Sequence, residues 1–289
     1  MKIIEPKVEL LSELNISPES HIARCARTCY GREYKEPNRE VDEKMVEGLI
    51  KRGHLSMLRH ASVYISHLEE ILPYLEKHIA NSPYWNYCMY LGYASTNLQE
   101  FMQSKTDRAP VTDISNKQFL EECSKHPDLF NLYRISFCLT TQISTSRELN
   151  RVSPNNIAEK STRYCSSKDS LLICRPWWFN KTSKDMSALG IRKLSIKEKI
   201  FAMAWKDAEE YYNKAIEIGM KPEDTRGILP LDTATKVIYT YSIREWQHIL
   251  DLRLYDKTGK AQPNCHVVMQ MIKDQINDFA KEHNIDYQV

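Results

Sequence analysis

The sequence predicts an α+β fold in one domain, with a mixed, largely antiparallel β-sheet flanked by helices. Helical and strand-like segments follow one another without the regular strand–helix–strand rhythm of a doubly wound sheet. No Pro-, Gly- or Ser-rich linker and no repeat interrupts the 289 residues, of which 42% are hydrophobic. We therefore expect a single domain over residues 1–289, with a mostly helical insertion at about 67–132.

The first predicted elements are two short strands, in MKIIEP and VELLSEL, followed by two helices in HIARCARTCY and NREVDEKMVEGLIKRG. In the second helix five apolar residues fall on one predicted core face: Val41, Met45, Val46, Leu49 and Ile50. Gly53 is typical of a helix end.

Two segments have the alternation that is typical of strands. In ASVYISHL, Val63 and Ile65 are expected to face the core, and Ser62, Tyr64 and Ser66 the other side. RISFCLTTQIS repeats the pattern. The insertion lies between these two strands, and the composition of EEILPYLEKHIA and KQFLEECSKH predicts helices there.

The strongest helix signal runs from Ser195 to about Met220. It begins with the capping-box spacing Ser195-x-x-Glu198 and ends near Gly219. Its predicted core face consists of Ile200, Met203, Ala204, Ala208, Tyr211 and Ala215. Beyond it, KVIYTYSI predicts a strand, EWQHILDLRL a short helix, and the segment after Pro263 a closing helix.

Composition excludes several classes of protein. With 40 Lys+Arg against 38 Asp+Glu, the net charge of +2 gives no overall attraction to nucleic acid or to an anionic membrane. There is no apolar run of about 20 residues and no leader-like N-terminus, so a cytoplasmic protein is expected. The eight cysteines form no CxxC pair and are expected to be reduced thiols without a metal.

The familiar catalytic and phosphate-binding motifs are missing. The chain has eight glycines and neither GxGxxG nor GxxxxGK[ST], so any phosphate must be held largely by side chains. HExxH and GxSxG are absent as well, and no cysteine stands in a recognisable nucleophile context. Metal and covalent catalysis therefore have no support in the sequence.

A dense polar run, SRELNRVSPNNIAEKSTRYC, follows a predicted strand. It is either a solvated loop with surface ion pairs or an anion site, because guanidinium groups bind phosphate bidentately and a serine adds a short donor. A second group, Arg226, Arg244 and Arg253, brackets a strand and a helix, where Arg253 could equally be a partner of the helix dipole. In a third segment, GHLSMLRHAS, His54 and His60 could equally be structural.

Together these segments resemble the flavin-dependent thymidylate synthases. The family signature RHRxxSxNExSxRY aligns without a gap with RVSPNNIAEKSTRY, and the matching letters are Arg151, Glu159, Ser161, Arg163 and Tyr164. The likeness continues in ARTCY, GHLSMLRH, RGILP, IREWQHILDLR and AQP, in the family's order. It covers roughly residues 1–65 and 133–275 and leaves the insertion unexplained.

The resemblance implies reductive methylation of dUMP to dTMP, with methylenetetrahydrofolate as carbon donor and FAD, reduced by NADPH, as hydride source. It implies no protein nucleophile, which agrees with the cysteine pattern. It also implies a homotetramer whose active sites combine residues of several subunits, with no nucleic-acid or membrane partner.

The resemblance also implies roles for individual residues. Those implied to bind dUMP are Glu148, Arg151, Glu159, Ser161, Thr162, Arg163, Arg226 and Arg253. Arg253 is the implied catalytic residue, since a cation beside the pyrimidine lowers the pKa of its N3. Those implied to bind FAD are His54, Ser56, Arg151, Ser242, Ile243, Arg244 and His248.

The chain departs from the family where flavin is expected, because Val152 and Ser153 replace the histidine and second arginine of the RHR triplet. The first alternative is therefore a dUMP-binding relative that has lost flavin chemistry. A nucleic-acid-binding protein is disfavoured by the near-neutral charge. The aromatic residues of SPYWNYCMYLGY either stack on a planar ligand or pack as an extra layer.

Overall fold

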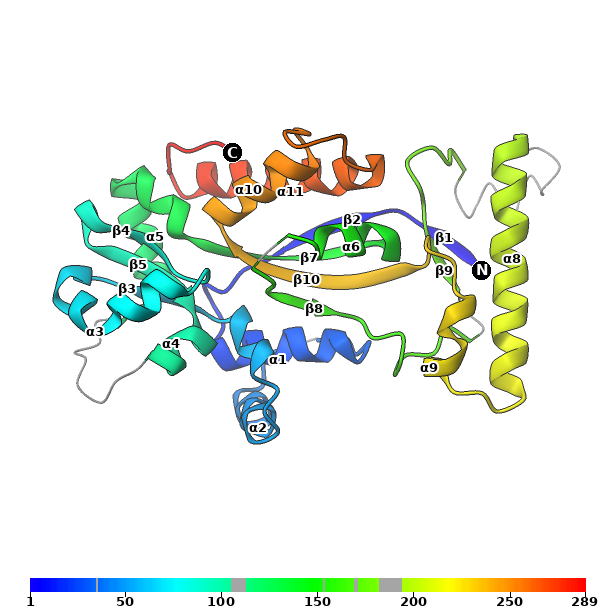
Figure 1. The fold of residues 1–289 in the computed structure, drawn as a ribbon, viewed down its shortest axis with the longest axis horizontal. Coiled ribbons are helices and arrows are strands. Elements are labelled where there is room, and N and C mark those ends of the chain that lie inside the picture. The colour runs from blue at the N-terminus through cyan, green and yellow to red at the C-terminus, as the bar shows by residue number, and fades with distance from the viewer. Residues whose placement is uncertain (35, 105–112, 153, 169–170, 182–193) are drawn as a thin grey trace.

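The computed structural model describes residues 1–34, 36–104, 113–152, 154–168, 171–181 and 194–289. Its central sheet has the order β2-β7-β10-β8 and is antiparallel throughout. The strands are β2 (Lys7–Leu11), β7 (Arg134–Gln142), β10 (Ala234–Ser242) and β8 (Ile157–Glu159). Helices flank this sheet, so the predicted α+β class is confirmed (Figure 1).

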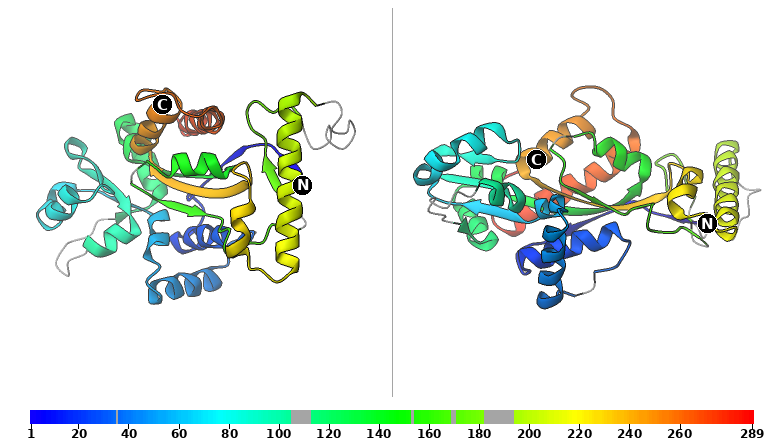
Figure 2. Two further views of the ribbon diagram at one scale, coloured as in Figure 1. Left: turned by 45° about the vertical axis from the view of Figure 1, so that its right-hand side comes forward. Right: turned by 60° about the horizontal axis from the view of Figure 1, so that its bottom comes forward.

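Helices cover both faces of the central sheet. On one face lie α6 (Ile143–Leu149), α10 (Ile243–Arg253) and α11 (Pro263–Glu282), and on the other lie α1 (Pro18–Cys29) and α2 (Arg39–Lys51) (Figure 1). Both views of Figure 2 keep these two layers apart. The core between the sheet and α10 is aromatic: Trp246 packs edge-on against Phe137 and Tyr241.

A second antiparallel sheet, of order β4-β5-β3-β6, lies at one end of the molecule. Its strands are β3 (Ser62–Ile65), β4 (Asn86–Cys88), β5 (Tyr93–Asn97) and β6 (Asp113–Ile114). The helices around it are α3 (Leu68–Asn81), α4 (Leu98–Ser104), α5 (Asn116–Lys125) and the 3-10 turns η1 (Leu55–His60), η2 (Met89–Leu91) and η3 (Pro127–Leu132). The sequence pattern does not predict β4, β5 or β6, because strands this short leave little periodic signal.

The other end of the molecule carries the long helix α8 (Ile196–Glu217), with α9 (Pro222–Thr225) and the turn η5 (Arg226–Ile228) beside it. A parallel pair, β1 (Lys2–Ile4) and β9 (Leu172–Cys174), joins this end to the central sheet. The capping box predicted at Ser195 and Glu198 is present. None of the helices in the described ranges, α8 included, is long and apolar enough to cross a bilayer.

The apolar face predicted for α8 was wrong for its large side chains, although Ala215 is buried as predicted. Ile200, Met203 and Tyr211 are exposed, while Trp205 and Tyr212, on the opposite side of the helix, are buried. The pattern was ambiguous because this helix has apolar residues on both sides, and only one side can pack on the rest of the chain.

Two smaller predictions of side-chain direction were also wrong. Tyr64 is buried: its ring stacks on Phe119 with centroids 4.3 Å apart, and its hydroxyl accepts a hydrogen bond from Arg134 N at 2.8 Å. The insertion covers that side of β3, so both of its faces are packed. In α2, Val41 and Ile50 are exposed at the margins of a buried stripe that is narrower than predicted.

Candidate functional site

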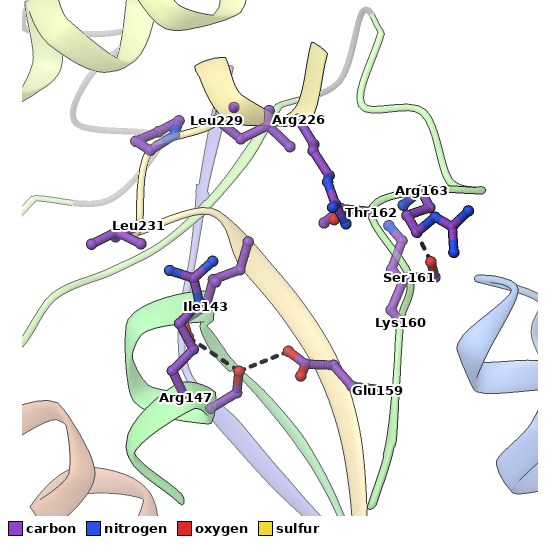
Figure 3. Close-up of a pocket in the computed structure, with 13 residues that line it drawn as sticks. Ile143, Arg147, Glu159, Lys160, Ser161, Thr162, Arg163, Arg226, Leu229 and Leu231 are labelled. Atoms are coloured by element: carbon purple, nitrogen blue, oxygen red, sulfur yellow. Dashed lines mark hydrogen bonds between the residues drawn. The ribbon is translucent and has the colours of Figure 1, made fainter. Parts of the chain in front are cut away.

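An open cavity of about 530 Å³ lies between α6, the segment that follows β8, and the turn η5 with the loop after it. We call it the arginine pocket (Figure 3). It is lined by Ile143, Ser146, Arg147, Glu159, Lys160, Ser161, Thr162, Arg163, Arg226, Gly227, Leu229, Pro230 and Leu231. Three segments that are distant in sequence therefore meet around one concave surface rich in cations.

The floor of the arginine pocket is a satisfied hydrogen-bond network around Glu159. Its Oε1 accepts from Ser146 Oγ at 2.7 Å and from Thr235 Oγ1 at 3.0 Å, and its Oε2 accepts from Asn150 Nδ2 at 3.3 Å. Tyr239 extends the network by donating to Asn150 Oδ1 at 2.7 Å. Because α6, β8 and β10 all contribute, the carboxylate fixes the relative position of the pocket walls.

Hydrogen bonds on both sides anchor the wall that follows β8. Lys160 N donates to Lys236 O at 2.8 Å, and Ser161 N donates to Cys29 O at 2.9 Å. Within this wall Arg163 N donates to Ser161 Oγ at 3.2 Å, which closes a tight local turn. The segment therefore presents consecutive polar side chains from a fixed backbone.

Five of the eight residues implied to bind dUMP line the arginine pocket: Glu159, Ser161, Thr162, Arg163 and Arg226. Their roles stay predictions, but the fold brings them together from segments more than 60 residues apart. Two further cations line the same space. Arg147 belonged to the polar run without an assigned role, and Lys160 was missed because it stands at a position that the signature leaves open.

Glu148 and Arg253 lie elsewhere. Arg253, the last residue of α10, donates from Nη2 to Glu148 O at 3.2 Å, and Cys265 Sγ donates to Glu148 Oε2 at 3.6 Å. Burial and the Glu148 carboxylate raise the pKa of the Cys265 thiol to about 12, so it stays neutral. Successive helix residues are rotated by about 100°, so Arg147 faces the arginine pocket while Glu148 does not.

The buried Arg253 Nε has no hydrogen-bond partner within the described ranges, so its N–H is an unused donor. Arg151, just beyond α6, is exposed. Neither residue lines the arginine pocket.

A smaller cavity of about 180 Å³ lies at the start of α10, and we call it the α10 pocket. It is lined by Val152, Pro154, Tyr241, Arg244, Glu245, His248 and Ile249. Arg244 and His248, two residues implied to bind FAD, are among them. No local pattern singles out Tyr241 or Glu245, because whether a side chain has a hydrogen-bond partner depends on the folded structure.

Buried polar atoms without partners mark the α10 pocket. Among the described residues, neither the Tyr241 hydroxyl nor Glu245 Oε1 has a hydrogen-bond partner. Burial raises the pKa of the Glu245 carboxyl, and Arg134, whose Nη1 lies 3.8 Å from Oε2, opposes the rise. Such atoms normally bind a ligand or water, because an unmade buried hydrogen bond is costly.

The other residues implied to bind flavin are scattered. Ser242 is the N-cap of α10, where its side chain accepts from Glu245 N at 3.2 Å, and Ile243 is fully buried. His54 and Ser56 are exposed at the start of η1 and line neither cavity.

The changed triplet is described only in part. Val152, at the position of the family's histidine, is buried in the main core, while Ser153 lies outside the described residues.

The fold is α+β, and four cationic side chains line its cavity: Arg147, Lys160, Arg163 and Arg226. The model of the thymidylate synthase complementing protein family matches residues 86–280, about two thirds of the chain. The chain belongs to this family, and the resemblance seen in the sequence is confirmed. The matched residues begin inside the predicted insertion at about 67–132, which the motifs of the resemblance do not cover.

Curated relatives are similar at low identity. A flavin-dependent thymidylate synthase of Thermosipho melanesiensis is 24% identical over 164 residues, which cover 56% of this chain and 71% of the relative. A probable flavin-dependent thymidylate synthase of Paramecium bursaria Chlorella virus 1 is 27% identical over 164 residues, covering 52% and 73%.

A crystal structure of the UMP/dUMP methylase PolB from Streptomyces cacaoi, bound with 5-Br dUMP, aligns with a TM-score of 0.43 at 15% identity. The alignment covers 97% of this chain and 93% of that one.

Proposed function

We propose that this protein makes dTMP by reductive methylation of dUMP, with methylenetetrahydrofolate as carbon donor and NADPH-reduced FAD as hydride source. The observation that carries the proposal is the meeting of Glu159, Ser161, Thr162, Arg163 and Arg226 around one cavity. The named relatives are flavin-dependent thymidylate synthases, which supports the same reaction.

The arginine pocket suits a nucleoside monophosphate. A phosphate monoester carries close to two negative charges at neutral pH, and arginine forks and serine hydroxyls bind it by charge-assisted hydrogen bonds. Ile143, Leu229 and Leu231 add apolar walls. In this proposal Arg253, with its spare Nε donor, acts on the pyrimidine and favours ionisation at N3.

The α10 pocket fits part of a flavin. Its apolar wall of Val152, Pro154 and Ile249 suits a planar ring. The Tyr241 hydroxyl and Glu245 Oε1, which have no partner among the described residues, offer hydrogen bonds to a heterocycle. Arg244 and His248 would hold the cofactor from α10. When bound, the reduced flavin supplies a hydride, and the chain's own task is to position the nucleotide and exclude water.

The two pockets support an assembled active site. Thr235 donates to Glu159 on the floor of the arginine pocket, and Tyr241 lines the α10 pocket, six residues further along β10. At roughly 3.3 Å per residue they are about 20 Å apart, whereas hydride transfer needs atoms in contact. We therefore propose that a neighbouring subunit of a homotetramer completes each site.

The exposed face of α8 supports self-association. Four large apolar side chains lie along it, opposite its buried face, and a fifth, Ile218, follows at its C-cap: Ile196, Ile200, Met203, Tyr211 and Ile218. An apolar row of this kind is unusual on the surface of a monomer. Light scattering is expected to give a tetramer mass that Ile200→Lys lowers and the neighbouring exposed Lys206→Glu leaves unchanged. A monomeric wild type would contradict the proposal.

Flavin binding is the first test of the function. Protein incubated with FAD and desalted is expected to keep a bound-flavin spectrum that shifts when dUMP is added. One observation favours the alternative function: Val152, at the position of the family's histidine, lines the α10 pocket with an apolar side chain that offers no hydrogen bond to a flavin. Colourless protein that still binds dUMP would support a nucleotide-binding relative without flavin chemistry.

Turnover is the second test. dTMP is expected to form from dUMP only when methylenetetrahydrofolate, NADPH and FAD are all present. Arg253→Ala should lower the rate at least a hundredfold, in the range for removing one charge-stabilising group. The matched control is Arg52→Ala, an exposed arginine at the end of α2. An unchanged rate in Arg253→Ala would contradict the assigned mechanism.

A further inference from the structure

The four cations of the arginine pocket are not equally free to bind an anion. Arg163 Nη2 donates to Glu223 Oε2 at 3.1 Å, and both side chains are exposed by more than a third. Among the described residues, no ion pair involves Arg147, Lys160 or Arg226. The Glu223 carboxylate therefore offsets the charge of Arg163 alone.

Glu159, the acid inside the pocket, forms no ion pair with the pocket cations in the described part of the chain. Its carboxylate lies on the floor, where it accepts hydrogen bonds from Ser146, Thr235 and Asn150. Figure 3 shows the ends of Lys160, Arg163 and Arg226 on one side of the cavity, away from Glu159, and Arg147 on the opposite side.

Lys160 is the most sheltered cation in that group. It is half-buried, whereas Arg163 and Arg226 are exposed. Its backbone is tied to Lys236 O, and its side chain passes close to Gly31, where a Cβ would lie 3.3 Å from Lys160 Cε. Gly31 has φ +64°, a conformation that favours glycine, and its missing Cβ leaves room for the lysine stem. A sheltered charge interacts more strongly with a phosphate than an exposed one does.

We propose that Lys160, together with Arg226, supplies most of the positive charge that binds the nucleotide phosphate, and that Arg163 contributes less because Glu223 already holds it. The inference rests on the proposed function and deepens it. It assigns phosphate binding to Lys160, at a position where the family signature specifies no residue. It also assigns Arg163, the signature's own arginine, a smaller share of the binding free energy.

The test is calorimetric titration of the FAD-loaded protein with dUMP and with deoxyuridine. Lys160→Gln is expected to weaken dUMP binding about tenfold or more, the effect of one charged hydrogen bond. Arg163→Gln should weaken it about threefold or less. Both variants should bind deoxyuridine as the wild type does, because it lacks the phosphate. Lys236→Gln, an exposed lysine outside the pocket, is the matched control.

Glu223→Gln should change dUMP affinity in the opposite direction to Lys160→Gln and Arg163→Gln. Removing this carboxylate releases Arg163, so dUMP affinity is expected to rise. In that background Arg163→Gln should cost about as much as Lys160→Gln does. This double-mutant cycle isolates the Arg163–Glu223 pair, which general damage to the fold would not reproduce.

The inference is overturned if Lys160→Gln resembles Lys236→Gln, or if Arg163→Gln costs more than Lys160→Gln while Glu223→Gln has no effect. Inorganic phosphate, as a second probe, separates this result from failure of the proposed function. If the wild type binds phosphate with the same ranking of variants but does not bind dUMP, the anion site stands and the dUMP function falls. If it binds neither, both are overturned.

Discussion

Tyr239 and Tyr241 lie two residues apart on β10, on the same face, with ring centroids 6.1 Å apart, yet they serve different sites. The Tyr239 hydroxyl donates to Asn150 and so belongs to the satisfied network under the arginine pocket. The Tyr241 hydroxyl is buried beside the α10 pocket without a partner in the described part of the chain.

The difference shows how completely a single subunit satisfies the hydrogen bonds of each site. The floor of the arginine pocket is complete, so this half of the site is preorganised. The α10 pocket has unmet hydrogen bonds, which a ligand, water or a neighbouring subunit must satisfy. Substitutions in the first region should therefore destabilise the protein itself, and those in the second should chiefly change what it binds.

Glu159→Ala should give the largest effect. Three donors lose their acceptor, so the free energy of unfolding should fall by about 2–4 kcal/mol, and dUMP binding should be lost as the walls of the pocket separate. Urea denaturation and calorimetry measure the two effects. Glu159→Gln, which keeps one acceptor oxygen, should lose less of both. Full stability in Glu159→Ala would contradict a preorganised floor.

The pH dependence of stability should come from a buried cluster between α1 and the central sheet. His60 Nδ1 hydrogen-bonds Thr240 at 2.8 Å, and Ser136 Oγ links Thr240, His21 and Glu13. Burial lowers the pKa of His60 to about 3 and that of His21 well below its usual range, and it raises the pKa of Glu13 to about 7.

The signs of these contributions are opposite. A depressed histidine pKa gives stability above pH 6.5 that is lost on acidification, about 2 kcal/mol for each histidine between pH 6.5 and 5. The raised pKa of Glu13 gives stability below pH 4.5 that is lost as the pH rises through 7, so over the same interval acidification regains a similar amount. Unfolding free energy measured from pH 7 to 5 should therefore fall less steeply in His60→Asn and more steeply in Glu13→Gln. Parallel profiles would contradict the assignment.

The tyrosine pair tests the comparison directly. Tyr239→Phe removes a made hydrogen bond and leaves Asn150 without its donor, so stability should fall by about 1–1.5 kcal/mol with unchanged FAD affinity. Tyr241→Phe removes an unpartnered hydroxyl, so stability should stay the same or rise by up to about 1 kcal/mol, while FAD affinity falls several-fold. Denaturation measures the stability of both variants, and flavin fluorescence titration measures their FAD affinity. Equal losses of stability would contradict the proposed difference between the two hydroxyls.

The sequence predicted the arginine pocket better than the α10 pocket, for a physical reason. Ser161 and Arg163 stand in one short run, and a local pattern can show such a run. Among the described residues, Lys160 has no acidic partner and the Tyr241 hydroxyl has no hydrogen bond. Both features depend on residues distant in sequence, which a local pattern does not show.

In the fold too, features set by local spacing could be predicted from the sequence, and features set by distant contacts could not. The strand and helix periods of β10 and α10 and the capping box of α8 were readable from local spacing. The buried side of α8 and the burial of Tyr64 were not, because a neighbouring element decides them.

The smallest expected effect is on stability in Glu223→Gln. Its ion pair with Arg163 lies at the surface, where such pairs contribute about 0–1 kcal/mol. The unfolding free energy should therefore change by less than about 0.5 kcal/mol and show little response to salt, whereas dUMP affinity should rise. Denaturation in low and high salt, beside a dUMP titration, separates the two readouts. A large loss of stability would mean that Glu223 holds the pocket wall in place. The proposed order of Lys160, Arg226 and Arg163 in phosphate binding would then be contradicted.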